Sequence, residues 1–326
     1  MKTTYIWCFF FTALVLSESA FAKLISGSAT SLPKKRSVQP PFFAGGIPPT
    51  GLPGTTQDMA LHQQTLPDDP PNTPPYFVSL FDPSTNTPFY SAYKVTPIQA
   101  GNLGNEKRPG GIKFKDPPGV PGVSIAYKEA IADTTQPGKP NQALTRGHLN
   151  PSAINSLDKR FMTATYTFTN AVPQFAATNF YLTNFESRVE NYAKNNCGRK
   201  DGTLYLLSGT SENGLIINQE GKPVQDLSNQ IPKPYQRDTF VQGTIKLVTP
   251  RSTWTAGCCI WLKPGEARRA ESFAVMSNNQ NKRTKVLLTE MRVLDLEELL
   301  KTPPSAAVNL FPGEEECRRP ENNIPL

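Results

Sequence analysis

The sequence predicts a mixed α+β domain with a largely antiparallel sheet over residues 76–317. Most apolar segments are short or alternate with polar residues, which is the pattern of strands, and they follow one another along the chain. Two segments, 179–195 and 293–301, instead show the three- to four-residue apolar spacing of a helix. Strands in series with few helices favour an α+β architecture, in one domain rather than two.

The expected strands are rich in β-branched and aromatic residues and are bounded by turn-forming residues. The first covers 76–81, and a turn rich in Asp, Ser and Asn separates it from a second strand at 88–93. Threonines alternate with apolar side chains in 161–168, which predicts a half-buried strand. Further strands are expected at 203–209, 240–248, 253–262 and 272–276. Residues 100–145 are rich in Gly and Pro and are expected to form loops.

The two expected helices are amphipathic. Leu182, Phe185 and Val189 share one face of the helix at 179–195. The helix at 293–301 has its leucines on one face, and Pro303-Pro304 stops it.

The ends of the chain are expected to lie outside the domain. Residues 1–22 combine Lys2, an apolar run and a small-residue cleavage site, which predicts a signal peptide and a secreted protein. Residues 23–75 are rich in Pro and Gly and are expected to form an irregular or partly wrapped N-terminal extension. Residues 318–326 are a C-terminal tail, and no later segment is long and apolar enough to span a membrane.

Four cysteines remain after the expected signal peptide. They are Cys197, Cys258, Cys259 and Cys317. An even number in an exported chain favours two disulfides, with three possible connectivities. We expect the adjacent Cys258 and Cys259 to take different partners, Cys197 and Cys317. A metal site is the weaker alternative, because no Cys-x-x-Cys pair occurs.

The chain is moderately basic, with a formal net charge of +7. Such a charge fits a polyanionic partner, because Lys and Arg neutralise phosphates and release counterions. It fits simple solubility equally well.

The chain has two histidines, and one of them lies in a segment with polar neighbours. His62 belongs to the Pro-rich extension, whereas His148 follows Arg146 and Gly147. A lone histidine is usually structural, so His148 needs support from other segments.

That support is a resemblance. The segment 145–151 resembles the Asp-Arg-Gly-His signature of the DNA/RNA non-specific endonucleases, and 169–174 resembles their Asn-x-x-Pro-Gln element. Segments 88–93, 205–210 and 254–259, and the closing helix followed by Cys317, resemble the secreted, endonuclease domain-containing 1-like branch of that family. The resemblance covers residues 76–317 and implies the ββα-metal, or His-Me finger, nuclease fold.

The resemblance also implies a chemistry: metal-dependent hydrolysis of DNA and RNA. His148 would be the general base that activates water, and Arg146 would bind phosphate oxygens. Asn179 would hold one Mg²⁺ or Mn²⁺ ion, which needs few protein ligands. Glu186 would hydrogen-bond the metal's waters, with Glu190 as the alternative acid.

Two further residues are implied to orient the site, and the helical pair has a plainer interpretation. Asn170 and Thr145 would position the groups around His148. Asn170 can equally be a turn residue. Asn179 and Glu186 can equally belong to an ordinary solvated helix face.

The chain departs from the family pattern at three points. Thr145 replaces the usual Asp, and Thr183 stands near the place of the usual Trp. The usual spacing of eight between the Asn and the Glu is shortened to seven from Asn179 to Glu186. These departures put the helical half of the site in question.

Two other functions therefore remain open. One is a catalytically inactive protein of the nuclease fold that binds nucleic acid or other polyanions outside the cell. The other is an unrelated secreted hydrolase, which is disfavoured because the chain has no Gly-x-Ser-x-Gly elbow.

Overall fold

The computed structural model of the protein describes residues 41–56, 59–117, 119–226, 236–237, 247–302 and 307–326. All of them belong to one compact unit, Gln39–Leu326. The expected signal peptide and most of the strand expected at 240–248 lie outside the described residues. No helix among the described residues is long and apolar enough to cross a membrane.

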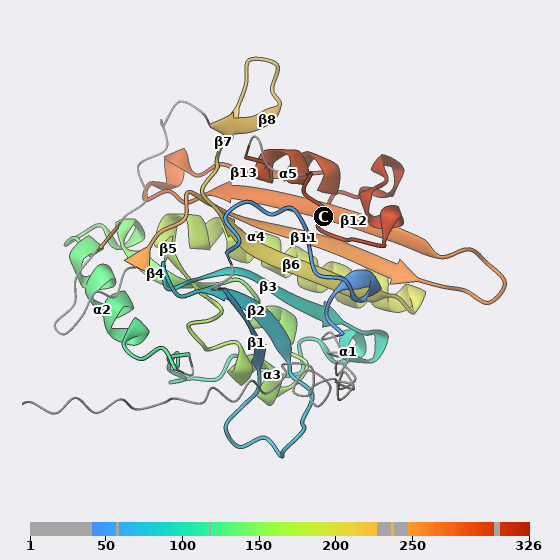
Figure 1. Ribbon diagram of the computed structural model, residues 1–326, viewed down its shortest axis with the longest axis horizontal. Coiled ribbons are helices and arrows are strands. Elements are labelled where there is room, and N and C mark those ends of the chain that lie inside the picture. Colours follow the sequence, from blue (N-terminus) through green and yellow to red (C-terminus); the bar gives the residue numbers. More distant parts are fainter. Residues whose placement is uncertain (1–40, 57–58, 118, 227–235, 238–246, 303–306) are drawn as a thin grey trace, which may run out of the picture. The chain divides into compact units, whose positions relative to one another are not determined.

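A seven-stranded antiparallel sheet forms the centre of this unit (Figure 1). Its spatial order is β1-β2-β3-β6-β11-β12-β13, and every neighbouring pair is antiparallel. The strands are β1 (Ala60–Gln64), β2 (Phe77–Asp82), β3 (Thr87–Val95), β6 (Thr203–Ser211), β11 (Ser252–Trp261), β12 (Arg269–Asn278) and β13 (Leu288–Met291). The predicted α+β class with a largely antiparallel sheet is confirmed.

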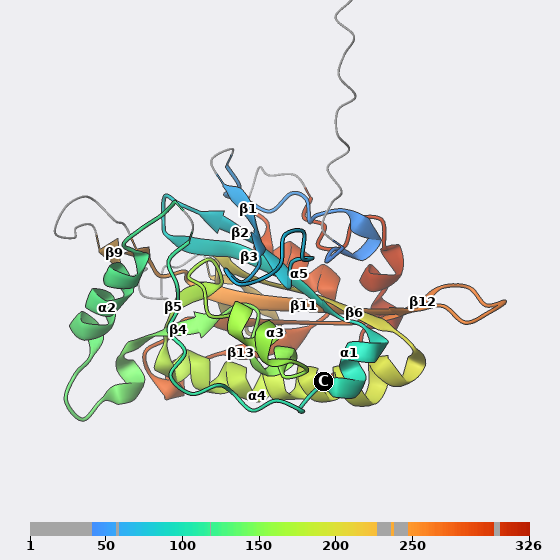
Figure 2. The same cartoon turned by 90° about the horizontal axis from the view of Figure 1, so that it is seen from below.

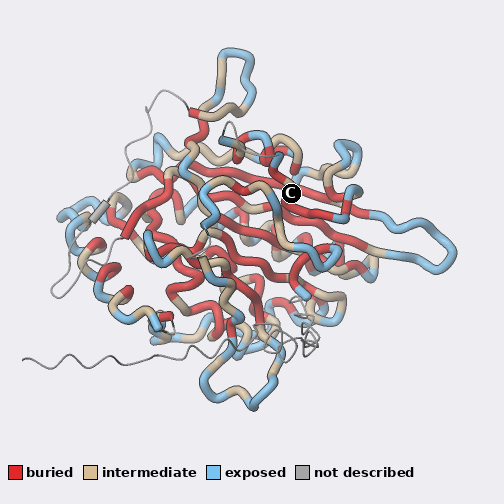
Figure 3. Tube along the Cα trace, in the orientation of Figure 1, coloured by how far each residue is buried: buried red, intermediate tan, exposed pale blue. Residues whose placement is uncertain are grey.

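The described residues also form three two-stranded ladders and five α-helices. The ladders are β4 (Leu144–His148) with β5 (Ala171–Phe175), β7 (Gly214–Ile217) with β8 (Pro223–Asp226), and β9 (Gln236–Arg237) with β10 (Leu247–Val248). The helices are α1 (Pro97–Asn102), α2 (Val123–Thr134), α3 (Lys159–Ala164), α4 (Ala176–Tyr192) and α5 (Val293–Leu300). Figure 3 shows that the central strands are buried along most of their length, whereas the β7–β8 hairpin and the β11–β12 turn are exposed.

Helix α4 covers one face of the sheet. Phe185 and Val189 pack against Leu204 and Leu206 of β6, all of them buried. The sequence predicted this helix and its apolar face, although α4 begins at Ala176, three residues earlier than expected. Its apolar stripe fixes which side of α4 points away from the sheet.

The opposite face is covered by α5 and by residues near the start of the described chain. Leu296 and Leu299 of α5 pack in one cluster with Phe42, Phe43 and Leu52. These three residues and β1 lie in the segment that the sequence assigned to an irregular extension. They belong to the same compact unit as the sheet because their apolar side chains are buried in its core.

The two disulfides lie on opposite faces of the sheet. Successive residues of a strand point to opposite sides, so the adjacent Cys258 and Cys259 on β11 cannot share a partner region. Cys259 bonds to Cys197 on the α4 side, and Cys258 bonds to Cys317 on the α5 side. The expected partners are confirmed, and the connectivity is settled.

The strand predicted at 161–168 is wrong. Residues 159–164 form α3, whose first turn is capped by the Asp158 carboxylate, which accepts hydrogen bonds from the backbone N–H groups of Arg160 and Phe161. The cap satisfies donors that a short helix otherwise leaves open. It therefore outweighs the strand-like alternation of the threonines.

Residues 100–145, which the sequence predicted to be rich in loops, also contain the helix α2. Val123, Ala126, Tyr127 and Ala130 are buried at helical spacing. The Asp116 carboxylate accepts hydrogen bonds from the backbone N–H groups at the start of this helix. The helical spacing of these apolar residues is visible in the sequence, but the surrounding Gly and Pro indicated loops.

Candidate active site

A pair of antiparallel strands, β4 and β5, followed by a helix carries the predicted site residues. Strands β4 and β5 pair with Arg146 opposite Pro173 and His148 opposite Ala171. Helix α4 begins at the residue after β5. Figure 2 shows the β4–β5 strand pair beside the first half of α4. The two motifs that are apart in the sequence are therefore adjacent strands of one ββα unit.

The pairing of β4 with β5 depends on a glycine at position 147. A Cβ there would lie 2.4 Å from Oε1 of Gln174. Gln174 is almost fully buried, and its Nε2 donates to the Thr253 hydroxyl at 3.3 Å. The Gly-His and Pro-Gln motifs are thus coupled sterically, because one strand leaves the space that the other strand's side chain occupies.

Thr145 and Asn170 hold the backbone on the two sides of His148. The Thr145 hydroxyl donates to the Gln174 carbonyl at 2.9 Å. The fully buried Asn170 accepts from the backbone N–H of Asn150 at 2.8 Å and donates to its carbonyl at 3.0 Å. Neither residue lines the cleft, so both act on His148 through the backbone.

The imidazole of His148 packs against two aromatic rings, which also contact each other. The centroids of Phe114 and Tyr166 are each 4.9 Å from the centre of the imidazole. Its Nε2 is buried and has no hydrogen-bond partner among the described residues. Burial, and to a smaller extent the charge of Arg108, lowers the pKa of His148 to about 3. The imidazole is therefore neutral at physiological pH and able to accept a proton.

Arg108 is a site residue that the sequence analysis missed. Its Nε donates to the Tyr166 hydroxyl at 2.6 Å, and its guanidinium carbon lies 5.6 Å from the centre of that ring. It lines the same cleft as His148 and acts electrostatically on both His148 and Glu186. No local motif surrounds it, so only the fold reveals its place.

One open cleft collects the predicted residues. Its volume is about 350 Å³, and Arg146 and His148 line it from β4. Four polar side chains of α4 also line it, Asn179, Thr183, Glu186 and Glu190. Residues seven apart are separated by about two helical turns, which places them on one face. The structure thus brings together both halves of the predicted site.

The two acids of this face have different surroundings. Within the described residues, no hydrogen bond reaches the carboxylate of Glu186. Burial raises the pKa of Glu186 to about 7, against the lowering effect of Arg108. Glu190 instead accepts a hydrogen bond from the Ser156 hydroxyl at 3.0 Å. The free carboxylate of Glu186 is the better candidate to hold metal-bound water.

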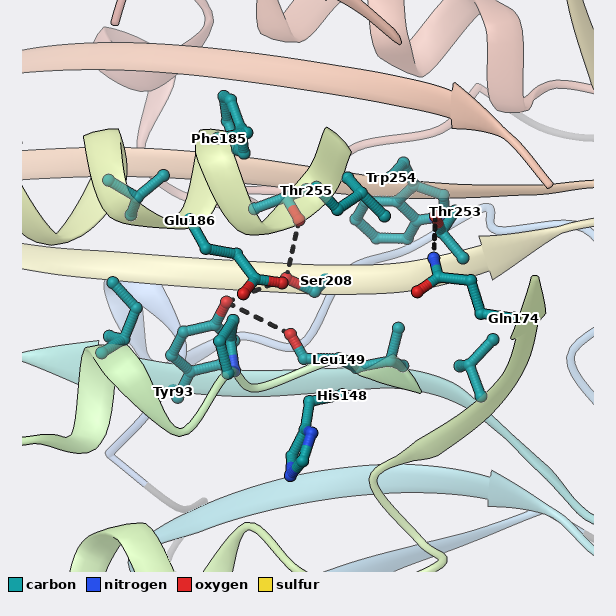
Figure 4. Close-up of a pocket in the computed structure, with 15 residues that line it drawn as sticks. Tyr93, His148, Leu149, Gln174, Phe185, Glu186, Ser208, Thr253, Trp254 and Thr255 are labelled. Atoms are coloured by element: carbon teal, nitrogen blue, oxygen red, sulfur yellow. Dashed lines mark hydrogen bonds between the residues drawn. The ribbon is translucent and has the colours of Figure 1, made fainter. Parts of the chain in front are cut away.

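A small cavity lies behind Glu186, between α4 and the sheet (Figure 4). Its volume is about 20 Å³, which is room for about one water and too small for a nucleotide. The Tyr93 hydroxyl is hydrogen-bonded to the Ser208 hydroxyl at 2.9 Å and lies 3.4 Å from the Leu149 carbonyl, to which it donates. Tyr93 therefore links the residue after His148 to the sheet beneath Glu186.

Two basic residues near the site are occupied elsewhere. Arg160 pairs with Asp68 and Asp69, and Arg188 pairs with Glu290. Their ion pairs agree with a structural role.

The donor atoms of the cleft fit a hard divalent cation. Asn179 offers an amide oxygen and Glu186 a carboxylate, and the Asn179 side chain has no hydrogen-bond partner within the described residues. Oxygen ligands suit Mg²⁺ and Mn²⁺. No cluster of three or more His, Cys, Asp or Glu suited to a metal occurs in the described part of the chain. An ion held here would keep several waters, as Mg²⁺ commonly does.

The strand pair and the helix, with His148 on β4 and Asn179 on α4, define the fold class of the ββα-metal nucleases. Residues 57–301 match the family model of the DNA/RNA non-specific endonucleases, and the chain belongs to this family. The family implies nucleic-acid substrates and a divalent metal.

Other comparisons are more distant. A chain from the crystal structure of the EndoG/EndoGI complex is similar, with 12% identity, a TM-score of 0.45, and coverage of 69% of this chain and 80% of that one. No curated protein sequence matches the chain.

Proposed function

We propose that the protein is a secreted, metal-dependent endonuclease that hydrolyses phosphodiester bonds of DNA and RNA. The observation that carries this proposal is the shared cleft of His148, Arg146, Asn179 and Glu186. It supplies a neutral base, a phosphate-binding cation and oxygen donors for a metal in one hollow. Together with family membership, this set favours hydrolysis over binding alone.

Each residue then has a distinct task. His148 accepts the proton of the attacking water, because its imidazole is neutral and lies in the cleft. Arg146 is exposed at the mouth of the cleft and binds phosphate oxygens with its forked N–H groups. Asn179 would hold the metal, and Glu186 would orient its waters. When bound, the metal supplies positive charge against the charge that develops on the phosphate.

The low pKa of His148 is consistent with this task once substrate is considered. Arg108 is one of the two causes of the low value. Burial is the larger cause and Arg108 the smaller, so a phosphate that brings negative charge next to Arg108 offsets the smaller contribution and raises the pKa of His148 above its value in the free protein. The base is therefore strengthened by the substrate itself.

Secretion is supported by the covalent structure. Two disulfides join Cys197 to Cys259 and Cys258 to Cys317, and such bonds persist in oxidising compartments. The apolar N-terminal segment with its expected cleavage site agrees with export.

A specific observation favours a second candidate function. Thr145 replaces the usual Asp, and it uses its hydroxyl for the Gln174 carbonyl rather than for the cleft. The loop beside His148 therefore lacks one carboxylate. On this alternative the protein is inactive and binds nucleic acid or other polyanions through the basic residues of the cleft.

Plasmid cleavage distinguishes the two candidates. The purified, oxidised protein is incubated with plasmid DNA and with RNA in Mg²⁺, in Mn²⁺ and in EDTA, beside His148→Ala. Metal-dependent cleavage that the variant loses supports the nuclease. Salt-sensitive binding without cleavage in either metal supports the alternative.

A further inference from the structure

An exposed patch of aromatic and basic side chains lies at the start of α4. It consists of Phe180, Tyr181, Lys282, Arg283 and Lys285, which we call the Phe180 patch. Phe180 is 47% exposed and Tyr181 is 37% exposed, which is unusual for large aromatic side chains. Their ring centroids are 5.6 Å apart and nearly perpendicular, at 87°.

The Phe180 patch begins one residue after a side chain that lines the cleft. Phe180 follows Asn179, which lines the cleft, and one residue turns a helix by about 100°. The ring of Phe180 therefore points about a quarter turn away from the Asn179 side chain, and it is exposed, away from the apolar face of α4.

The basic part of the patch is held in place against the helix. The Arg283 guanidinium lies 4.0 Å from the centre of the Phe180 ring. Arg283 follows β12, and the backbone N–H of Gln280 in the same segment donates to the Thr178 hydroxyl at 2.8 Å. The contact between ring and cation is thus supported by a fixed backbone rather than by a free loop.

The chemistry of the patch identifies its partner. Lys282 and Lys285 are exposed, and neither has an ion pair within the described residues. Exposed aromatic rings that stack on bases, with Lys and Arg beside them for phosphates, are the elements of single-strand recognition. In a duplex the bases are already stacked on each other, so the ring has no base face to bind.

We propose that the Phe180 patch binds an unpaired nucleotide that flanks the scissile phosphate, and that it gives the enzyme a preference for single-stranded over duplex substrate. This inference rests on the proposed function, since it places the strand in the His148 cleft. The base stacks on Phe180 beside Arg283, and the neighbouring phosphates meet Lys282 and Lys285.

Binding measured without cleavage tests the proposal. The His148→Ala protein in Mg²⁺ is titrated against a fluorescent single-stranded oligonucleotide of about 16 nucleotides and against the matching duplex. Adding Phe180→Ala should weaken single-strand binding by about 5- to 100-fold and change duplex binding by less than about 3-fold. Phe180→Trp should restore single-strand binding. The control is Ile98→Ala, because Ile98 is 81% exposed on α1 and lies outside the patch and the cleft.

The outcomes separate this inference from the nuclease proposal. An equal loss on both probes, or no loss on either, overturns the single-strand proposal even if the wild-type protein cleaves plasmid. A selective loss on the single strand supports it even if no cleavage is found. Thermal unfolding of each variant shows whether the exposed substitutions leave the fold intact.

Discussion

Gln174 occupies the space in which a side chain at position 147 would stand. A Cβ on Gly147 would lie 2.4 Å from Oε1 of Gln174 and 3.0 Å from its Cβ. The obstruction lies one residue before His148, so a shift of the β4 backbone that relieves it also moves the imidazole. Two motifs that the sequence shows as separate are therefore one steric unit.

Gly147→Ala is expected to reduce activity strongly, because the added methyl group must displace Gln174 or the β4 backbone. Overpacking of this kind costs about 1 to 3 kcal/mol of unfolding free energy. Cleavage rate and thermal unfolding are measured together. Gly110→Ala is the control, since no atom lies within 4 Å of a Cβ there. Equal behaviour of the two variants would show that the contact is unimportant.

The two acids of α4 should separate in activity. Glu186→Gln is expected to lower kcat by about 10²-fold or more, because it removes the charged group that would orient the metal's waters in the transition state. Glu190→Gln should have a smaller effect, because Glu190 is engaged by the Ser156 hydroxyl and its amide replacement can keep an acceptor there. The measurement is kcat at saturating Mg²⁺. A larger loss in Glu190→Gln would assign the metal-water role to Glu190.

The sequence was sufficient where local pattern and tertiary structure agree. Apolar spacing in 179–195 predicted the α4 face, and the same spacing placed Asn179 and Glu186 together on the cleft side. The adjacency of Cys258 and Cys259 was enough to assign them different partners, and the alternation of side chains along β11 explains why. These features depend on neighbours within a few residues.

The rest depended on contacts that are distant in the sequence. Phe114, Tyr166 and Arg108 surround His148, but they come from a Gly- and Pro-rich segment and from the end of α3. Nothing in their own surroundings marks them as site residues. Likewise, the Asp158 cap decided between helix and strand for 159–164, whereas the alternating threonines indicated the strand. The surroundings of His148 and the helix at 159–164 are therefore determined by side chains outside the periodic pattern.

Arg108 should be important for activity. Arg108→Ala is expected to lower kcat/KM by about 10²-fold, because it removes a cation from the cleft that receives the phosphate. Arg108→Lys keeps the charge but loses the Nε–H that donates to the Tyr166 hydroxyl, so it should recover only part of the activity. The same Ala substitution should raise the pKa of His148 in the metal-free protein, as followed by NMR. An unchanged pKa would show that Arg108 does not act on the base.

His148 and Glu186 should give the metal-free protein opposite pH dependences of stability. The pKa of His148 is about 3 in the fold against an ordinary 6.5, so the unfolded chain binds more protons between these values. This contribution lowers stability as pH falls from 6.5. The pKa of Glu186 is about 7 against an ordinary 4.5, so the folded chain binds more protons there. This contribution lowers stability as pH rises from 4.5 to 7.

Two variants isolate these contributions in EDTA. Relative to wild type, the Tm of His148→Gln should rise as pH falls below 6.5, because the variant no longer buries a group that prefers to be charged. The Tm of Glu186→Gln should rise relative to wild type as pH increases from 4.5 to 7. Added Mg²⁺ should abolish the Glu186→Gln effect, because a nearby cation favours the ionised carboxylate and lowers its pKa. A Glu186→Gln difference that is independent of both pH and Mg²⁺ would place this carboxylate outside the metal site.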